Sequence, residues 1–531
     1  METYDFAIVG SGFGGSVAAH RLTQKGYRVL VLERGRRFGD DDFAKTNWDL
    51  PRYLWFPLLG CHGIMEFSFL RHALFVHGSG IGGGSLVYAG VLMEPDEHIF
   101  EAEEWTRLAD WRTMLAPHYA EARRMLGIAP NPRLGPADDV LMRLDGSAGK
   151  DRLRTTEVGI FFGPQGETVA DPYFAGEGPS RAGCIFCGGC MVGCRYNSKN
   201  TLVKNYLHFA EAGGAHILPD VLVDGLLPLP SGEVDGARYL VRFRRLRNGR
   251  GRGEVRARQV VVSAGTLGTL ELLLRCRDGL RSLPKLSARL GEKVRTNSEA
   301  FVGSMARDGR VDYSEGVSIT SILRVDPVTQ VEPVRYPKGS SLLRILTLPL
   351  IDAAGQGLLV RLAKTGLAIL RHPIDSLREK VFPAWARRIT ILLVMEAREN
   401  FLSMRWERSP LKLFRQGAVT RRDTALPPPT ELPAAHRLAR AFAAQTNGIP
   451  AAAWTETLFD MSVTAHLLGG CPMGRTPEEG VVDLKGEAFG YPGLYVVDGS
   501  VMPGNLGINP SLTIAAMAEH LMSQIPEQAR P

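Results

Sequence analysis

The sequence lacks any long apolar stretch that is free of charge. No such run reaches roughly 18 residues anywhere in the 531-residue chain, and a membrane-spanning helix needs about 20. We therefore expect no transmembrane helix. No basic leader precedes the first apolar run, METYDFAIVGSG, so we also expect no secretory signal.

Cysteine is scarce and unevenly distributed. The chain has seven cysteines, an odd number, and four of them crowd between Cys184 and Cys194. Structural disulfides in secreted proteins are usually spread along the chain, so this pattern does not indicate a disulfide framework. It favours a reducing, cytoplasmic location.

Clustered charge is also missing. The net charge is +7 and the isoelectric point is about 9.0, yet lysine and arginine are scattered along the chain. A nucleic-acid-binding protein gathers such charge in a patch or stripe, so we predict no nucleic-acid partner. A basic surface that tolerates anionic membranes is the alternative that we favour, and it leaves peripheral membrane contact open.

The N-terminus carries a complete dinucleotide-binding pattern. A strand at residues 5–10 is followed by a glycine-rich turn at 10–15 and a helix at 16–26. A second strand at 28–33 ends in an acid. Gly10 permits the tight turn, Gly12 lets the backbone approach a pyrophosphate, and Gly15 allows the helix to pack on the strand. Glu33 can accept hydrogen bonds from a ribose. A lone G-x-G-x-x-G often marks only a turn, but the full pattern predicts a nucleotide site for either FAD or NAD.

A second glycine cluster lies at residues 78–85. Four glycines in the five positions 80–84 do not suit the interior of a helix or a strand. A flexible linker is one interpretation, but apolar runs (HALFV and LVYAGVLM) flank the cluster. We therefore predict a loop pressed against a flat ligand.

The C-terminal end combines a histidine motif with a helix start. Residues 466–474 read HLLGGCPMG, and residues 494–500 read LYVVDGS. Asn509 is a suitable N-cap and Pro510 suits the first turn of the helix that follows. A capped helix is the plain interpretation. The functional one adds that a helix N-terminus aimed at a flavin would stabilise the negative charge that flavin gains on reduction.

Together these segments resemble the glucose–methanol–choline (GMC) oxidoreductase family, a likeness that also includes residues 260–276 and spans most of the chain outside roughly 300–455. The cholesterol oxidase group is most similar, although Leu467 stands where its histidine motif often has proline. The resemblance implies an α/β fold with a discontinuous Rossmann-type FAD-binding domain and an α+β substrate domain with an antiparallel sheet. The expected ranges are 1–300 (with a cysteine-rich loop at 181–207) and 456–531 for the FAD domain, and 301–455 for the substrate domain.

The resemblance also assigns site residues. His466 and Asn509 match the family's active-site pair: a histidine suits removal of the hydroxyl proton because its pKa lies near neutrality, and the Asn509 amide can bind the substrate oxygen. Glu332 is the candidate for moving a proton during double-bond isomerisation, with a surface glutamate as the equal alternative. The implied cofactor contacts are Gly10, Gly12, Gly15, Glu33, Gly82, Gly83, Ser85, Val223, Asp498, Gly499, Asn509 and Pro510.

The cysteine cluster has the spacing C-x2-C-x2-C-x3-C, formed by Cys184, Cys187, Cys190 and Cys194. This spacing suits a four-iron cluster of bacterial ferredoxins. Arg195, however, stands where the ferredoxin run has proline, and free thiols or a local disulfide beside the flavin are the interpretation that we favour. An iron–sulfur cluster would let electrons leave the flavin singly.

The middle of the chain is the least informative part. EPVRYP, RRITILLVMEA and FLSMRWER indicate strands of one sheet over the flavin. Residues 341–388 have apolar residues at helical spacing with interspersed arginine and lysine. We slightly favour buried helices of a cap domain over a basic amphipathic lid on a membrane surface.

From these observations we predict FAD-dependent oxidation of a bulky hydrophobic alcohol, a 3-hydroxysteroid such as cholesterol, with oxygen or another redox acceptor. Isomerisation of a double bond would depend on Glu332. The first alternative is a flavin-dependent alcohol dehydrogenase that passes electrons to a cysteine-bound iron–sulfur centre or a quinone. The second is a membrane-associated binding protein with a vestigial flavin.

Overall fold

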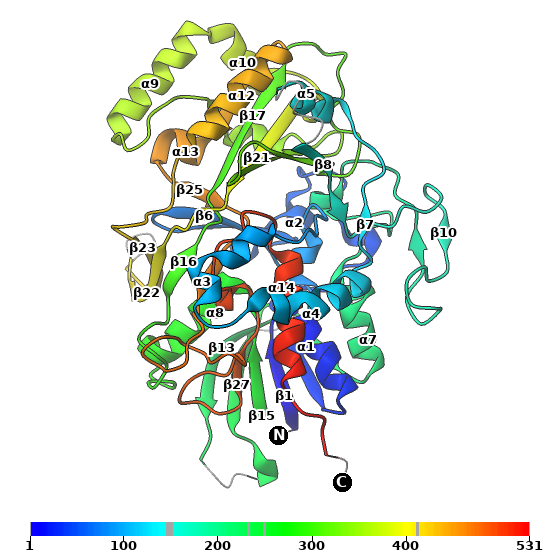
Figure 1. Cartoon of the computed structure of the whole chain (residues 1–531), viewed down its shortest axis with the longest axis vertical. Coiled ribbons are helices and arrows are strands. Elements are labelled where there is room, and N and C mark those ends of the chain that lie inside the picture. The colour runs from blue at the N-terminus through cyan, green and yellow to red at the C-terminus, as the bar shows by residue number, and fades with distance from the viewer. Residues whose placement is uncertain (1, 145–151, 231–233, 248–250, 410–413, 530–531) are drawn as a thin grey trace.

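The computed structural model describes residues 2–144, 152–230, 234–247, 251–409 and 414–529. Two large sheets lie toward opposite ends of the molecule, and both termini lie beside the first sheet (Figure 1). None of the helices in these ranges is long and apolar enough to cross a membrane.

The first sheet is built around the N-terminal nucleotide pattern. Its strands are, in spatial order, β12 (His216–Leu218), β2 (Val29–Leu32), β1 (Thr3–Val9), β15 (Arg252–Val262), β14 (Tyr239–Arg245) and β13 (Val221–Pro228), with β27 (Leu494–Val496) also paired to β15. The pairs among β12, β2, β1, β15 and β27 are parallel, whereas β14 and β13 add antiparallel edges. The parts of the central strands that pair in the core, residues 6–9, 29–32 and 260–262, are apolar because both faces of a parallel sheet are buried.

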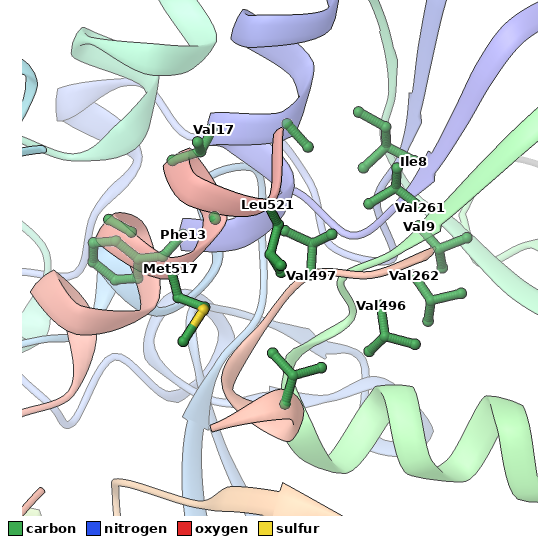
Figure 2. Close-up of a cluster of buried hydrophobic side chains, with 14 of the residues drawn as sticks. Ile8, Val9, Phe13, Val17, Val261, Val262, Val496, Val497, Met517 and Leu521 are labelled. Atoms are coloured by element: carbon green, nitrogen blue, oxygen red, sulfur yellow. The ribbon is translucent and has the colours of Figure 1, made fainter. Parts of the chain in front are cut away.

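Helices from both ends of the chain cover this sheet. They are α1 (Phe13–Gln24), α4 (Trp111–Met125), α7 (Tyr206–Ala212) and α14 (Ser511–Ser523). Helix α1 packs against α14 and α7, and α14 packs against α4. Figure 2 shows the core that results, with Ile8, Val9, Val261, Val262 and Val496 from the strands beside Phe13, Val17, Met517 and Leu521 from the helices. The predicted discontinuous Rossmann-type domain is therefore confirmed: its two ends share one apolar core.

The second large sheet is antiparallel, as predicted. Its order is β20 (Thr347–Pro349), β24 (Gly448–Ala453), β17 (Glu299–Ala306), β21 (Ile389–Glu396), β19 (Thr329–Val334), β18 (Ser321–Arg324) and β8 (Leu153–Thr155). Helix α12 (Pro433–Gln445) covers one face, and α5 (Pro136–Leu144) packs against α12. Strand β8 reaches this sheet from the sequence range expected to belong to the FAD domain.

One predicted strand belongs to a different sheet. FLSMRWER forms β22 (Leu402–Arg408), which pairs with β23 (Gln416–Arg422) and β16 (Glu292–Arg295), and β26 (Leu468–Gly470) completes this four-stranded sheet. The expectation of a single sheet over the flavin was therefore wrong for this segment. A three-stranded sheet of β25 (Ser462–Thr464), β6 (Ala73–Gly78) and β5 (Met65–Phe69) lies between the two halves.

Two helices of residues 341–388 expose their apolar side chains. Helices α9 (Leu358–Arg371) and α10 (Pro373–Val381) form a hairpin that projects from the end of the molecule opposite the termini (Figure 1), and α11 (Trp385–Arg388) follows. Their exposed apolar side chains are Leu358, Leu359, Val360, Leu362, Leu367, Ile369, Leu370, Ile374, Leu377 and Val381. The favoured prediction of buried cap helices was wrong for α9 and α10, because the apolar stripe that suggested a core contact faces solvent, whereas Trp385 and Ala386 of α11 are buried.

Candidate active site

A cavity of about 730 Å³ lies between the nucleotide-type sheet and the antiparallel sheet. Its lining includes most of the residues assigned from the sequence: Gly10, Gly12, Glu33, Gly83, Val223, His466, Asp498, Gly499, Asn509 and Pro510. Gly15, Gly82, Ser85 and Glu332, all within the described residues, do not line it. The structure thus gathers segments from both ends of the chain and from strand β13 around one space.

The glycines of the first turn divide into two kinds. A Cβ atom added to Gly12 would meet no protein atom within 4 Å, whereas one added to Gly15 would lie 2.1 Å from the Gly10 carbonyl oxygen. Gly15 therefore serves close helix–strand packing, and Gly12 faces open space at the N-terminus of α1. Helix α1 has no acidic residue in its first turn and no side-chain cap, so its N–H groups and positive dipole end remain available to a pyrophosphate.

Glu33 is positioned by the same turn. Its carboxylate accepts hydrogen bonds from the Ser11 backbone N–H (3.1 Å), the Ser11 hydroxyl (2.8 Å) and the Gly35 N–H (2.9 Å). These bonds hold the buried acid at the end of β2, facing the cavity. An acid at this point of a dinucleotide site binds the ribose hydroxyls.

The second glycine loop shapes the cavity rather than lining it throughout. Gly82 has a φ of +103°, and its N–H donates to the Ser11 hydroxyl (3.1 Å). Ser85 donates to the Gly82 carbonyl (2.7 Å) and accepts from the Leu202 N–H (3.1 Å). Gly82 and Ser85, expected to contact the cofactor, do not line the cavity themselves and fix the loop that presents Gly83 to it.

The C-terminal helix begins one residue later than predicted. Pro510 is the N-cap of α14 and lies in the αR region, while Asn509 does not cap the helix. The first turn has no side-chain cap and no acidic residue, and both Pro510 and Ser511 line the cavity. The helix N-terminus therefore keeps free donors for an electron-rich ring. Because Asn509 does not cap the helix, its side-chain amide is available for other contacts.

Asp498 is held by its own short turn. Its carboxylate accepts from the Ser500 N–H (2.9 Å), the Ser500 hydroxyl (2.6 Å) and the Thr269 hydroxyl (2.5 Å), and burial raises its pKa. Gly499 follows at the cavity surface. These contacts leave Asp498 at the cavity edge with its backbone fixed.

His466, Asn509 and Glu332 meet in one cluster. Asn509 Nδ2 donates to Glu332 Oε2 (3.3 Å) and lies 3.5 Å from His466 Nε2. Glu332 is fully buried, which excludes the alternative of a surface glutamate. His466 is only 13% exposed, and that fraction opens into the cavity. Within the described residues, Asn509 Oδ1 is a buried acceptor without a hydrogen-bond partner.

Two residues without a motif complete the cluster. Glu299 Oε1 lies 2.5 Å from His466 Nδ1, and Glu299 also accepts from the Ala465 N–H (2.9 Å). Asn297 accepts from the Gly507 N–H (2.9 Å) and donates to the Ile508 carbonyl (3.2 Å), which fixes the loop that carries Asn509. The only sequence signals were an acid at the start of an apolar strand and an asparagine before it, which here adopts a left-handed φ of +56°.

The electrostatics of the cluster shift the pKa values of two of its groups. Burial lowers the pKa of His466, but the carboxylates of Glu299 and Glu332 outweigh burial and leave that pKa above its usual value. Burial raises the pKa of Glu332 to about 7, against the opposing effects of His466 and the Asn509 amide. Because Glu299 faces Nδ1, the Nε2 atom of neutral His466 is free to accept a proton on the cavity side.

The opposite wall of the cavity is apolar. Its side chains come from the antiparallel sheet and its loops, from the segments on either side of the exposed hairpin and from the start of helix α13 (Trp454–Phe459): Phe301, Ile319, Val334, Leu343, Leu346, Trp385, Ile389, Ile391, Leu393 and Trp454. Residues 389, 391 and 393 lie on one face of strand β21, because side chains alternate between the two faces of a strand. Such a wall suits a bulky hydrophobic ligand whose polar end meets His466 and Asn509.

Comparison with known proteins agrees with this arrangement. Family models described as GMC oxidoreductase match residues 180–294 and 402–518, and one described as an NAD(P)-binding Rossmann-like domain matches residues 8–41. A cholesterol oxidase of Mycobacterium tuberculosis is 44% identical, covering 99% of this chain and 91% of its own. A cholesterol oxidase of Acinetobacter baumannii is 42% identical, with 98% and 94% covered.

The fold also matches a solved structure, pyridoxine 4-oxidase from Mesorbium loti, with a TM-score of 0.61 and 16% identity over 98% of this chain and 99% of the other. That likeness shows the fold alone. The sequence identity over nearly the whole length shows more: the chain belongs to the GMC oxidoreductase family, in its cholesterol oxidase group, and is an FAD-dependent oxidoreductase that acts on CH–OH groups.

Proposed function

We propose that the protein oxidises the 3-hydroxyl group of a sterol such as cholesterol. The observation that carries this proposal is the meeting of His466 Nε2 and Asn509 Nδ2 at one end of a large apolar cavity, beneath the free N-terminus of α14. A sterol has one hydroxyl on a rigid apolar body, and the cavity offers one polar end and an apolar wall. The names of the relatives from M. tuberculosis and A. baumannii support the same substrate class.

The chain's own residues handle the proton and the oxygen. His466 Nε2 accepts the hydroxyl proton, and Glu299 stabilises the imidazolium that forms by its contact at Nδ1. The Asn509 amide donates to the substrate oxygen and orients the carbinol carbon. FAD, when bound along Gly12 and Glu33, supplies the hydride acceptor. The names of the relatives indicate oxygen as an acceptor of the electrons.

Glu332 supports a second step, isomerisation of a ring double bond. Its carboxyl group lies beside the oxygen-binding pair, and burial brings its pKa to about 7, so that it can take a proton and return it near neutral pH. Glu332 itself does not line the cavity, so its carboxylate would have to reach past Asn509 to remove a proton from one ring carbon and deliver it to another. The Asn509 amide, which contacts both Glu332 and the oxygen position, would couple the two steps.

The exposed hairpin supports peripheral contact with a lipid surface, where sterols reside. Its ten exposed apolar side chains are accompanied by Lys364, Arg371 and Arg378, a composition typical of interfacial helices. Lys380 of α10 donates to the carbonyls of Arg344 (2.8 Å) and Thr347, which joins the hairpin to a segment that lines the cavity. A sterol leaving a membrane would therefore enter beside α10.

Anaerobic bleaching of the flavin tests the proposal. Purified holoenzyme is mixed without oxygen with cholesterol, with long-chain primary alcohols and with sugars, and flavin absorbance is followed. We expect full bleaching by sterols at micromolar concentration, slower bleaching by long-chain alcohols and none by sugars. A response to sugars alone would refute the hydrophobic substrate. Conversion of cholesterol to the conjugated ketone, followed by its ultraviolet absorbance, reports isomerisation separately.

A further inference from the structure

The four clustered cysteines surround a cavity of their own. Cys184 and Cys190 are buried, Cys187 and Cys194 are partly buried, and all four are free thiols. They line a small cavity, separate from the main one, together with Ile160, Ile185 and Lys199. We propose that this loop binds an iron–sulfur cluster through these four thiolates.

The backbone of the loop turns tightly between the cysteines that line this cavity. Phe186 has a φ of +56°, Gly188 of +71° and Gly193 of +98°. A Cβ atom at Gly188 would lie 2.3 Å from the Ser314 carbonyl oxygen, and one at Gly193 would lie 2.2 Å from the Phe43 ring. Side chains are therefore excluded where the loop turns most tightly. A left-handed Phe186 between two cysteines carries a conformational cost that wrapping a metal centre would explain.

A backbone donor points at one of the sulfurs. The Phe186 N–H donates to Cys184 Sγ (3.4 Å), and the Ser318 hydroxyl donates to the Gly188 carbonyl (3.2 Å), which holds the turn between Cys187 and Cys190. N–H groups aimed at sulfur stabilise thiolates and tune the potential of a bound cluster. The buried ammonium of Lys199 lies at the same cavity and offsets the negative charge that four thiolates would bring.

The spacing of the thiols does not suit one zinc ion. Ligands of a tetrahedral zinc–thiolate site lie about 3.8 Å apart, since each Zn–S bond is about 2.3 Å. Across the described part of the chain, no three of these sulfurs fall within 4.8 Å of one another. An iron–sulfur cluster is several ångströms across and holds its thiolates farther apart. Four thiolates in the run C-x2-C-x2-C-x3-C match that group.

The cysteine cavity and the active-site cavity share a wall. Met191, next to Cys190, lines the main cavity, as does Tyr88. Lys199 ties the wall together by donating to the carbonyls of Cys190 (2.6 Å), Leu86 (2.8 Å) and Tyr88 (3.2 Å). A cluster here would lie beside the cofactor. It would offer electrons an exit besides oxygen.

The electrons and protons of this route balance. Oxidation of one CH–OH group to C=O releases two electrons and two protons. The cluster would relay the electrons one at a time to a quinone, which takes both electrons and two protons to become a quinol. This relay rests on the proposed function, whereas binding of the cluster does not.

Metal and sulfide analysis tests the proposal. Full-length holoenzyme is purified without oxygen, and iron, zinc and acid-labile sulfide are measured per chain. The protein is then reduced with dithionite for low-temperature electron paramagnetic resonance. We expect about four iron and four sulfide per chain and the signal of a reduced cluster. Cys187→Ser should lower iron and sulfide several-fold, whereas Cys61→Ser, a cysteine distant in sequence from the loop, should leave both unchanged.

Several results would overturn the proposal. They are iron and sulfide near zero even after reconstitution with ferrous iron and sulfide, one zinc per chain, and loss of iron in Cys61→Ser equal to that in Cys187→Ser. If Cys187→Ser does not fold, alkylation of the wild type decides: mass spectrometry should show the four thiols protected until a chelator and oxidant remove the iron. Flavin bleaching by sterols in the wild type is measured separately, so an absent cluster and an inactive substrate are told apart.

Discussion

The two walls of the active-site cavity recognise their ligands by different means. The wall on the side of the parallel sheet is largely backbone, presented by glycines such as Gly12, Gly83 and Gly265. The opposite wall is made of bulky side chains on strands β17, β19 and β21. A backbone surface demands glycine at fixed positions, so the sequence displays it as a motif. A side-chain wall demands only apolar bulk, which any buried strand supplies.

The largest effect should come from adding a side chain to a glycine of the backbone wall. Gly12→Val places its side chain where no protein atom lies within 4 Å of the Cβ position, so the apoprotein should fold while the pyrophosphate is displaced. We expect the FAD content of the purified protein, measured by absorbance, to fall below a tenth of the wild-type value. Thermal denaturation of the two apoproteins should differ by only a few degrees.

Gly15→Ala is the matched control for that wall. Its Cβ atom would lie 2.1 Å from the Gly10 carbonyl oxygen, so it should lower the stability of the apoprotein itself. If Gly12→Val kept stoichiometric FAD, or if both variants lost stability alike, the distinction between a ligand-facing and a packing glycine would be wrong.

The same contrast explains what could be predicted from the sequence. The α/β fold, the glycine turn and the pairing of His466 with Asn509 follow from motifs whose residues act locally. Glu299 has no motif, because its role depends on the antiparallel sheet bringing it to His466 from 167 positions away in the sequence. Glu332 could only be placed by the order of segments. The hairpin of α9 and α10 was misjudged because the same apolar stripe serves a core contact and an exposed surface.

The next largest effect should come from His466, which lies where the two walls meet. His466→Gln keeps a hydrogen-bonding side chain but removes the base, and general-base catalysis contributes about 10²–10⁴-fold to such steps. We expect the rate of anaerobic flavin reduction by a sterol to fall by that factor in stopped-flow measurements, with FAD content unchanged. A loss of less than tenfold would show that another group takes the proton.

A moderate effect should come from narrowing the side-chain wall. Leu393 lies two residues after Ile391 on strand β21, so both side chains face the cavity. Leu393→Trp should therefore obstruct a sterol ring system. We expect kcat/KM for sterols to fall by about 10–200-fold, the range that one apolar contact in a pocket controls. FAD content should be unchanged, and a slender primary alcohol should lose much less. An equal loss for both substrates would mean that the wall does not select by size.

The smallest and most specific effect should come from Glu299, which reaches His466 from the antiparallel sheet. The carboxylates of Glu299 and Glu332 hold the pKa of His466 above its usual value in spite of burial, and the base works only when it is neutral. Removing the charge in Glu299→Gln lowers that pKa, so the acidic limb of the pH profile of kcat/KM should move to lower pH. Glu332→Gln should move the limb in the same direction but less, because Glu332 contributes less than Glu299 to the shift of the His466 pKa. A limb that stays in place or moves to higher pH in Glu299→Gln would show that Glu299 only fills space. A shift in the expected direction would show that a carboxylate of the antiparallel sheet sets the pKa of His466. The histidine itself belongs to the motif of the FAD-binding half.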